Sequence, residues 1–113
     1  MAKVEIVTPL FNEIRKKFKA ESHKIIDLME SLENNPNKGK PLGNIGGIAI
    51  KEIRYKSFRF YFITDGHKLK LLSEEHLKDL LIAFVRMSDK KEQQKTINEI
   101  KKVLINMGAG GFS

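Results

Sequence analysis

Apolar residues follow a strand-like spacing at the start of the chain and a helical spacing after it. Val4 and Ile6 alternate with charged neighbours, which predicts a short strand over residues 3–7. Apolar residues then recur every three or four positions, at Phe11, Ile14, Phe18, Ile25, Met29 and Leu32. This spacing is typical of one buried helix face. It fits either one long helix or a hairpin of two helices.

Capping residues indicate where these helices begin and end. Thr8 followed by Pro9 favours a helix start with Thr8 as the N-cap and Pro9 in the first turn. In the hairpin alternative, a break near residue 20 would let Ser22 cap the second helix. Residues 34–47 hold two prolines, four glycines and four asparagines, which predicts a turn-rich loop after the helices.

The centre of the chain has the spacing of a β-hairpin. Residues 48–56 are predicted to form a strand, in which a bulge near Lys51 would bring Ile50 and Ile53 to one face. After a tight turn at residues 56–57, three phenylalanines alternate with other residues at positions 58, 60 and 62. If these rings fill the core, Arg59 and Tyr61 face outward.

The last third of the chain predicts one or two further strands and a helix. Asp65-Gly66 is a hairpin-turn signal, which predicts a strand over residues 67–72. The apolar run at residues 80–87 fits a strand buried on both faces, with a short helix starting near Glu74 as the alternative.

Ser88 or Asp89 would cap a final helix, with Glu92 as the capping-box acid. The apolar face of that helix is Ile97, Ile100, Leu104 and Met107, and Gly108 ends it. The pattern predicts an α+β domain over residues 1–107, in which helices cover one face of a small antiparallel sheet. Residues 108–113 are predicted to be a flexible, glycine-rich tail.

Charge is the feature of the composition that bears most on function. The 113 residues contain 21 Lys and Arg against 14 Asp and Glu, a net charge of +7, and residues 36–59 alone carry +5. This concentration favours a binding surface for nucleic acid or an acidic protein over a charge that only keeps the protein soluble.

The chain has no cysteine, which excludes disulfides and a cysteine nucleophile. It has no membrane-spanning run and no signal segment, so we expect a cytoplasmic protein that does not bind membranes.

Few residue patterns point to classical catalytic sites. His23, His67 and His76 lack the spacing of metal ligands, and no G-x-S-x-G motif is present, so we expect no metal and no other cofactor. The basic residues are therefore the remaining candidates for a functional site. Such a cluster on a sheet face would bind phosphates and stabilise charge during RNA cleavage by a 2′-hydroxyl, with Tyr55 or Tyr61 stacking on a base. The alternative is an exposed sheet face with cross-strand ion pairs.

Five short motifs, in this order, resemble the RelE/ParE toxin superfamily, and the last is similar to its HigB-like branch. They are residues 31–36 (SLENNP), 39–42 (GKPL), 53–55 (IRY), 58–62 (FRFYF) and 83–91 (AFVRMSDKK). The resemblance implies a sheet of four or five strands with an N-terminal helical hairpin and a C-terminal helix. It also implies a toxin held inactive by a cognate antitoxin. RelE-like and HigB-like toxins cleave mRNA on the ribosome without metal, whereas ParE-like toxins inhibit DNA gyrase.

The resemblance also implies roles for individual residues. Arg59 matches the arginine that supports the transition state, Arg54 the arginine of the preceding strand, and Arg86 the basic position that ends the last strand. These three are the candidate catalytic residues. The candidate RNA-binding residues are Lys38, Lys40, Lys51, Lys56, Tyr61, Lys90 and Lys91.

Two functional hypotheses follow. The first is a ribosome-dependent mRNA endonuclease that inhibits translation. The second is a non-nucleolytic protein of the same fold that binds gyrase, RNA or only its antitoxin. It is motivated by the C-terminal tyrosine or histidine that several RelE nucleases use, since this chain has neither after His76. Because Arg59 is expected to be exposed, its replacement by alanine should cost about 0.5 kcal/mol or less.

Overall fold

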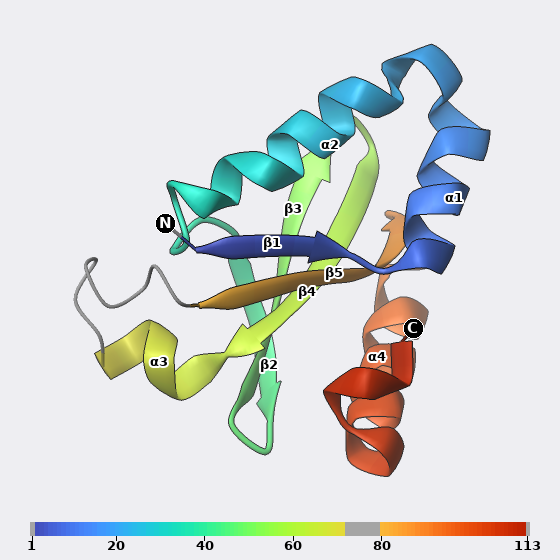
Figure 1. The fold of residues 1–113 in the computed structure, drawn as a ribbon. Helices are drawn as coiled ribbons and strands as arrows, with labels where there is room; N and C mark the ends of the chain where they lie inside the picture. The colour runs from blue at the N-terminus through green and yellow to red at the C-terminus, as the bar shows by residue number, and fades with distance from the viewer. Residues whose placement is uncertain (1, 72–79, 113) are drawn as a thin grey trace.

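A five-stranded sheet with helices on both faces forms the centre of the molecule (Figure 1). The computed structural model describes residues 2–71 and 80–112. The strands are β1 (Lys3–Ile6), β2 (Lys40–Ile45), β3 (Ile48–Tyr55), β4 (Phe58–Asp65) and β5 (Leu81–Asp89). The helices are α1 (Thr8–Phe18), α2 (Ser22–Glu30), α3 (Gly66–Leu71) and α4 (Gln93–Met107). Short 3₁₀ turns at Lys19–Glu21, Ser31–Glu33 and Ala109–Phe112 complete the chain. The α+β class is confirmed.

The sheet has the order β1-β5-β4-β3-β2. All neighbouring strands are antiparallel except β1, which pairs parallel to β5. Strand β2 lies inside residues 34–47, where only a loop was predicted. It is an edge strand, and an edge tolerates Pro41 and the shift in pairing between Pro41 and Gly43.

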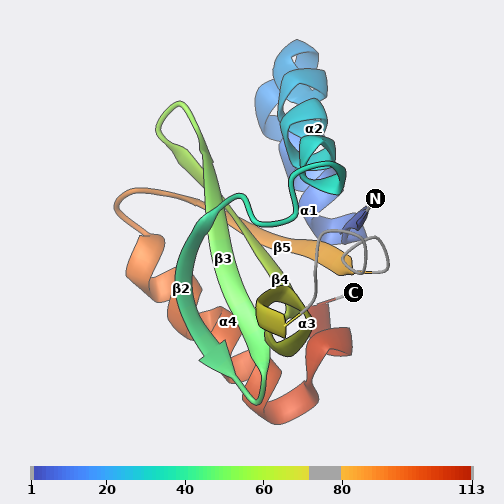
Figure 2. The same cartoon turned by 90° about the vertical axis from the view of Figure 1, so that its left-hand side faces the viewer.

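Helices cover both faces of the sheet, and Figure 2 shows α1 and α2 on one side and α4 on the other. One apolar core lies between the sheet and the N-terminal helices, and it includes Ile53, Phe60 and Phe62. A second core lies under α4 and includes Ile50 and Tyr61. The prediction that helices cover one face only is therefore wrong. No bulge is needed at Lys51, because each of the two isoleucines is buried on its own face, and β3 pairs with β4 in unbroken register.

The N-terminal helical segment is a hairpin, as one of the two alternatives predicted. Its helices meet at Lys19, which has a positive φ of 50°. The predicted caps are wrong in detail. Thr8 already belongs to α1, and Val7 is the N-cap without a side-chain hydrogen bond. The Ser22 hydroxyl donates to the carbonyl of Ile14, 3.3 Å away, so it ties α2 to α1 instead of capping α2.

The predicted strand at residues 67–72 is a helix over the described part. Asp65 Oδ1 accepts the backbone N–H groups of His67 at 3.0 Å and Lys68 at 3.1 Å, which satisfies two donors at the start of α3. The same Asp-Gly pair that favours a hairpin turn therefore begins a helix here. Residues 72–79, with Glu74 and His76, lie outside the described residues.

The C-terminal segment packs against the second core. Asp89 Oδ1 accepts the Glu92 N–H at 2.8 Å just before α4, and Gly108 ends the helix with a φ of 72°. Met107 is 70% exposed, so it does not belong to the predicted apolar face of α4. Most of the predicted loose tail forms the last 3₁₀ turn, which buries Phe112 to 2% exposure in the second core. No helix within the described residues is long and apolar enough to cross a membrane.

Candidate functional site

Arg59 lies near the centre of a polar cluster on the α4 side of the sheet. It pairs with Arg54 on β3 and with Ser88 on β5, and residues that pair across strands share a face of the sheet. Glu52 and Tyr61 form the next pair on the same face. The cluster is at the end of the sheet where α4 begins, because the Gln93 side chain amide donates to Glu52 Oε1 at 3.4 Å.

Arg59 is buried, which differs from the outward-facing position predicted for it. Its exposure is only 5%, since α4 covers the face opposite the phenylalanines as well. Its Nε lies 3.8 Å from Glu52 Oε2, and its Nη1 donates to the Ser57 carbonyl at 3.4 Å. Within the described residues, Arg59 Nε and Glu52 Oε2 have no hydrogen-bond partner. Charge attraction across this 3.8 Å distance therefore holds the two atoms together, and no hydrogen bond among the described residues satisfies either of them.

Glu52 is a site residue that the sequence analysis missed. It is 1% exposed, and Arg54 Nη2 lies 3.8 Å from its Oε1. A glutamate in the middle of a strand has no local signature that distinguishes it from an ordinary surface residue. The informative signal was that it is the one acid among six basic residues in residues 36–59.

Exposed cations surround the buried pair. The Arg54 side chain is 53% exposed, and Lys40 lies opposite Glu52 on β2. Lys38 is exposed in the loop before β2, and Lys90 and Lys91 are exposed between β5 and α4. We call this region the basic end; its residues are Lys38, Lys40, Arg54, Arg59, Lys90 and Lys91. The structure thus gathers six of the ten predicted site residues at one end of the sheet.

Tyr61 does not present its ring to solvent as a base-stacking residue would. It is fully buried in the second core, and its hydroxyl is 2.7 Å from the Ser88 hydroxyl. Burial, which disfavours the phenolate, raises the pKa of Tyr61, while the hydrogen bond with Ser88 partly offsets this rise. In this position Tyr61 supports the floor of the cluster. Tyr55 is half-buried and packs edge-on against Phe18, 6.3 Å between ring centroids.

Arg86 lies beside the cluster and is held away from it. It is half-buried opposite Tyr61, and its Nη1 donates to the Val85 carbonyl at 2.8 Å. Its guanidinium lies 4.9 Å from the centre of the Phe112 ring. This cation–π contact directs the guanidinium toward the C-terminal turn.

Two predicted RNA-binding lysines are separate from the basic end. Lys51 is 4% exposed on the opposite face, where its Nζ donates to the Asn37 carbonyl at 3.0 Å, and burial lowers its pKa. Lys56, at the tip of the β3–β4 turn, forms an ion pair with Glu21 at 3.0 Å. That hydrogen-bonded ion pair raises the pKa of Lys56 and lowers the pKa of Glu21. Both lysines connect parts of the fold.

The site contains cations, one carboxylate, hydroxyls and an amide. Within residues 2–71 and 80–112, no three His, Cys, Asp or Glu side chains gather in a way that could hold a metal ion. The chemistry that this cluster itself offers is the binding of anions and the stabilisation of negative charge.

Comparison with known proteins supports the fold. No family model and no curated protein matches the sequence. The structure is similar to a chain in the crystal structure of the archaeal RelE–RelB complex from Pyrococcus horikoshii OT3, with a TM-score of 0.59 and 15% identity. The match covers 79% of this chain and 94% of the other. At this identity the likeness shows the fold alone, and that fold is RelE-like.

Proposed function

We propose that the protein is the toxin of a toxin–antitoxin system and cleaves mRNA on the ribosome. The observation that supports this function best is the basic end, where two arginines and four lysines surround one buried carboxylate on a RelE-like fold. The similar structure is that of a complex named RelE–RelB, which supports a cognate antitoxin as the partner of this chain. We place the action in the cytoplasm, where ribosomes and mRNA are found.

In this proposal each group at the basic end has its own task. The lysines bind mRNA phosphates, and Arg54 presents its exposed guanidinium to the phosphate at the cleavage point. Arg59 stabilises the negative charge that develops as the neighbouring 2′-oxygen bonds to phosphorus and the bond from phosphorus to the 5′-oxygen of the next nucleotide breaks. The 2′-hydroxyl gives its proton to water, and the departing 5′-oxygen takes a proton from water. Glu52 acts as a positioning residue, because it is 3.8 Å from both arginines. Arg86, held against Phe112, would have to leave that ring to join the reaction.

The deciding experiment is a cleavage assay with purified chain, free of antitoxin, on ribosomes that carry a defined mRNA. Arg54→Ala tests the site without disturbing the core, since Arg54 is exposed. Arg15→Ala on α1 is the matched control, because Arg15 is also an exposed arginine. We expect new mRNA 5′ ends with the wild type and the control, and at least a tenfold slower reaction with Arg54→Ala.

Other outcomes would redirect the proposal. Intact mRNA at a stoichiometric dose of toxin would contradict the nuclease function. If expression of the chain then still arrested growth and induced the DNA-damage response, the second hypothesis of a gyrase-binding toxin would replace it. Absence of any arrest with soluble protein would leave a binding module that shares the fold.

A further inference from the structure

A small polar pocket lies between α1 and α4, which cover opposite sides of the sheet (Figure 2). The last residues of β5, Met87, Ser88 and Asp89, line it. Strand β1 pairs with β5 only as far as Phe84, so this part of β5 forms an edge of the sheet. The volume of the pocket is about 290 Å³, which is at the lower limit of ligand sites and suits one small chemical group.

Helical spacing brings the polar side chains of this pocket together. Glu92, Thr96 and Glu99 are four and three residues apart, so they share one face at the start of α4. Glu13 and Lys17, four residues apart, share a face of α1 in the same way. The two helix faces therefore meet at the end of β5.

Carboxylates dominate the lining of this pocket, which we call the acidic pocket. Its charged residues are Glu13, Lys17, Asp89, Glu92, Lys95 and Glu99. Among the described residues none of these six side chains forms an ion pair. Lys17 is directed to the Phe58 ring, with 4.9 Å between Nζ and the ring centre. Asp89 accepts the Glu92 N–H through Oδ1 alone. The carboxylates therefore keep most of their capacity to accept hydrogen bonds.

A buried hydroxyl without a partner is a second, independent sign of a ligand. Thr96 lines the pocket and is 7% exposed, and its hydroxyl has no hydrogen-bond partner in the part of the chain that the structure describes. Buried polar groups are normally hydrogen-bonded. Ser88, similarly buried, shows the ordinary case, because its hydroxyl lies 2.7 Å from the Tyr61 hydroxyl and donates to the Asp89 carbonyl at 2.9 Å. The Thr96 hydroxyl is thus available to a group that enters the pocket.

The acidic pocket adjoins the basic end. Ser88 lines the pocket and pairs across the strands with Arg59, which places their Cα atoms about 5 Å apart. Lys90 and Lys91 directly follow Asp89. A ligand that spans this boundary would meet cations on one side and hydrogen-bond acceptors on the other. An RNA nucleotide has this polarity, since its phosphate is an anion and its base can present N–H donors.

We propose that the acidic pocket binds the base of a nucleotide whose phosphate lies at the basic end, and that it selects bases with an exocyclic amino group. Ionised carboxylates only accept hydrogen bonds, so they match the amino groups of adenine, guanine and cytosine. Uracil has no amino group, and its two carbonyl oxygens would face the carboxylates unfavourably. Phe58 and Met87 supply apolar surface for the base ring. The proposal rests on the proposed function, because that function makes RNA the ligand of the basic end.

The test measures binding of RNA that cannot be cleaved. Trinucleotides with 2′-O-methyl riboses lack the 2′-hydroxyl that the proposed reaction needs. Three are compared: one of adenine, one of purine, which is adenine without its amino group, and one of uracil. Binding to ¹⁵N-labelled protein is followed by chemical-shift changes. We expect the adenine trinucleotide to bind at least tenfold more tightly than the other two, with shifts at the amides of Ser88, Asp89 and Thr96.

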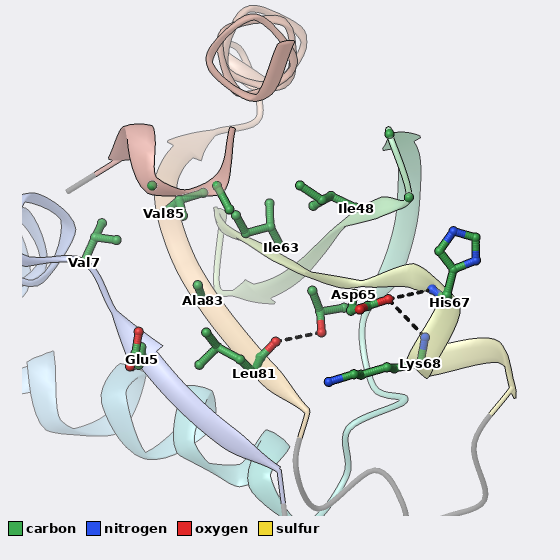
Figure 3. Close-up of a pocket in the computed structure, with 15 residues that line it drawn as sticks. Glu5, Val7, Ile48, Ile63, Asp65, His67, Lys68, Leu81, Ala83 and Val85 are labelled. Carbon is green, nitrogen blue, oxygen red and sulfur yellow. Dashed lines mark hydrogen bonds between the residues drawn. The ribbon is translucent and has the colours of Figure 1, made fainter. Parts of the chain in front are cut away.

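The opposite end of β5 provides an internal control. A larger cavity of about 640 Å³ lies there, lined by Leu81 and Ala83 (Figure 3). Leu81 begins the strand, whereas Ser88 is next to its end. The amide signals of Leu81 and Ala83 should therefore stay in place during the titrations. Shifts confined to those two amides would put the trinucleotide outside the acidic pocket and contradict the proposal.

Substitutions separate recognition of the base from simple charge repulsion. Glu92→Ala and Glu99→Ala should each reduce the advantage of adenine over purine to threefold or less. Thr96→Val, which keeps the shape of the side chain, should weaken the adenine trinucleotide at least threefold. Glu30→Ala is the matched control, because Glu30 is an exposed glutamate on α2 outside the pocket, and it should keep the tenfold advantage.

Two results with these variants would overturn the proposal. If the carboxylates only repel the RNA backbone, Glu92→Ala and Glu99→Ala will tighten all three trinucleotides by the same factor. If the wild type binds the three trinucleotides equally, the pocket does not read the amino group.

The ribosome assay separates this proposal from the proposed function. Cleavage of mRNA by a wild type that binds the three trinucleotides equally would refute the base pocket alone. Selective binding of the adenine trinucleotide together with intact mRNA would refute the nuclease function, and the acidic pocket would stand as a base-binding site.

Discussion

Glu52 and Arg59 face each other on adjacent strands, with 3.8 Å between Oε2 and Nε, and both side chains are almost completely buried. Their backbones are two residues out of direct register, since Glu52 pairs with Tyr61 and Arg54 pairs with Arg59. In this diagonal contact the charges of Glu52 and Arg59 neutralise each other beside the exposed Arg54. Removal of Glu52 would leave the buried Arg59 without its carboxylate partner, and removal of Arg59 would leave the buried Glu52 with only the exposed Arg54 as a counter-charge.

Replacement of one partner should therefore be much more costly than an exposed arginine would suggest. We expect Glu52→Leu and Arg59→Ala each to lower the free energy of unfolding by about 3 kcal/mol or more. The double variant Glu52→Leu, Arg59→Met should lie closer to the wild type than either single variant, because it leaves no unpaired charge. Urea unfolding of the four proteins measures this cycle. Surface substitutions usually change the free energy of unfolding by about 0.5 kcal/mol or less. If both single variants fall within that range of the wild type, the pair is solvated and the prediction is wrong.

The C-terminal turn should contribute to stability through Phe112. Its ring is 2% exposed in the second core, so Phe112→Ala should cost about 3 kcal/mol. Met107→Ala is the control: that side chain is 70% exposed, and its loss should change stability by about 0.5 kcal/mol or less. Thermal unfolding of both variants compares them. Equal, small effects would show that the tail is loose, as the sequence alone suggested.

Lys51 should make the stability of the protein depend on pH in the alkaline range. Burial lowers its pKa in the folded state below the ordinary 10.5, so between these two values the unfolded chain holds more protons. The contribution of Lys51 to the free energy of unfolding therefore rises as the pH increases through the lowered folded pKa, and it levels off near pH 10.5. Lys51→Met should abolish this rise. Urea unfolding of the wild type and of Lys51→Met over pH 8–11 measures it, because the difference between their free energies of unfolding removes the contribution of all other titrating groups. A constant difference would contradict the lowered pKa.

Local patterns predicted most of the secondary structure, and the misses have long-range causes. The alternation of Phe58, Phe60 and Phe62 placed Arg59 on the opposite face correctly. Its burial depends on α4, which begins 34 positions later and returns to cover that face, and no pattern around Arg59 contains this fact. Likewise, β2 becomes a strand because β3 offers it an edge, although its own prolines and glycines favour a loop.

The candidate site was predicted in part for the same reason. Spacing and charge identified the basic residues, but they could not show that Lys51 is buried on the opposite face or that Lys56, itself exposed, pairs with Glu21. Glu52 was missed because its role comes from Arg59 on the neighbouring strand, from Arg54 two residues along its own strand, and from Gln93 on α4.

Asp65 provides a last prediction, on the helix that replaced a predicted strand. Backbone N–H groups of Lys68 and His67 donate to its carboxylate and lower its pKa below the ordinary 3.8. The resulting contribution to the stability of α3 is present above pH 3.8 and is lost as the pH falls through the lowered folded value. Asp65→Ala should therefore speed hydrogen exchange of the His67 and Lys68 amides at pH 6, while Ile100 in α4 exchanges at its wild-type rate. Unchanged exchange at all three amides would mean that Asp65 does not hold the start of α3, and that Gly66, whose N–H donates to Gly47 at 2.8 Å, is sufficient to begin the helix.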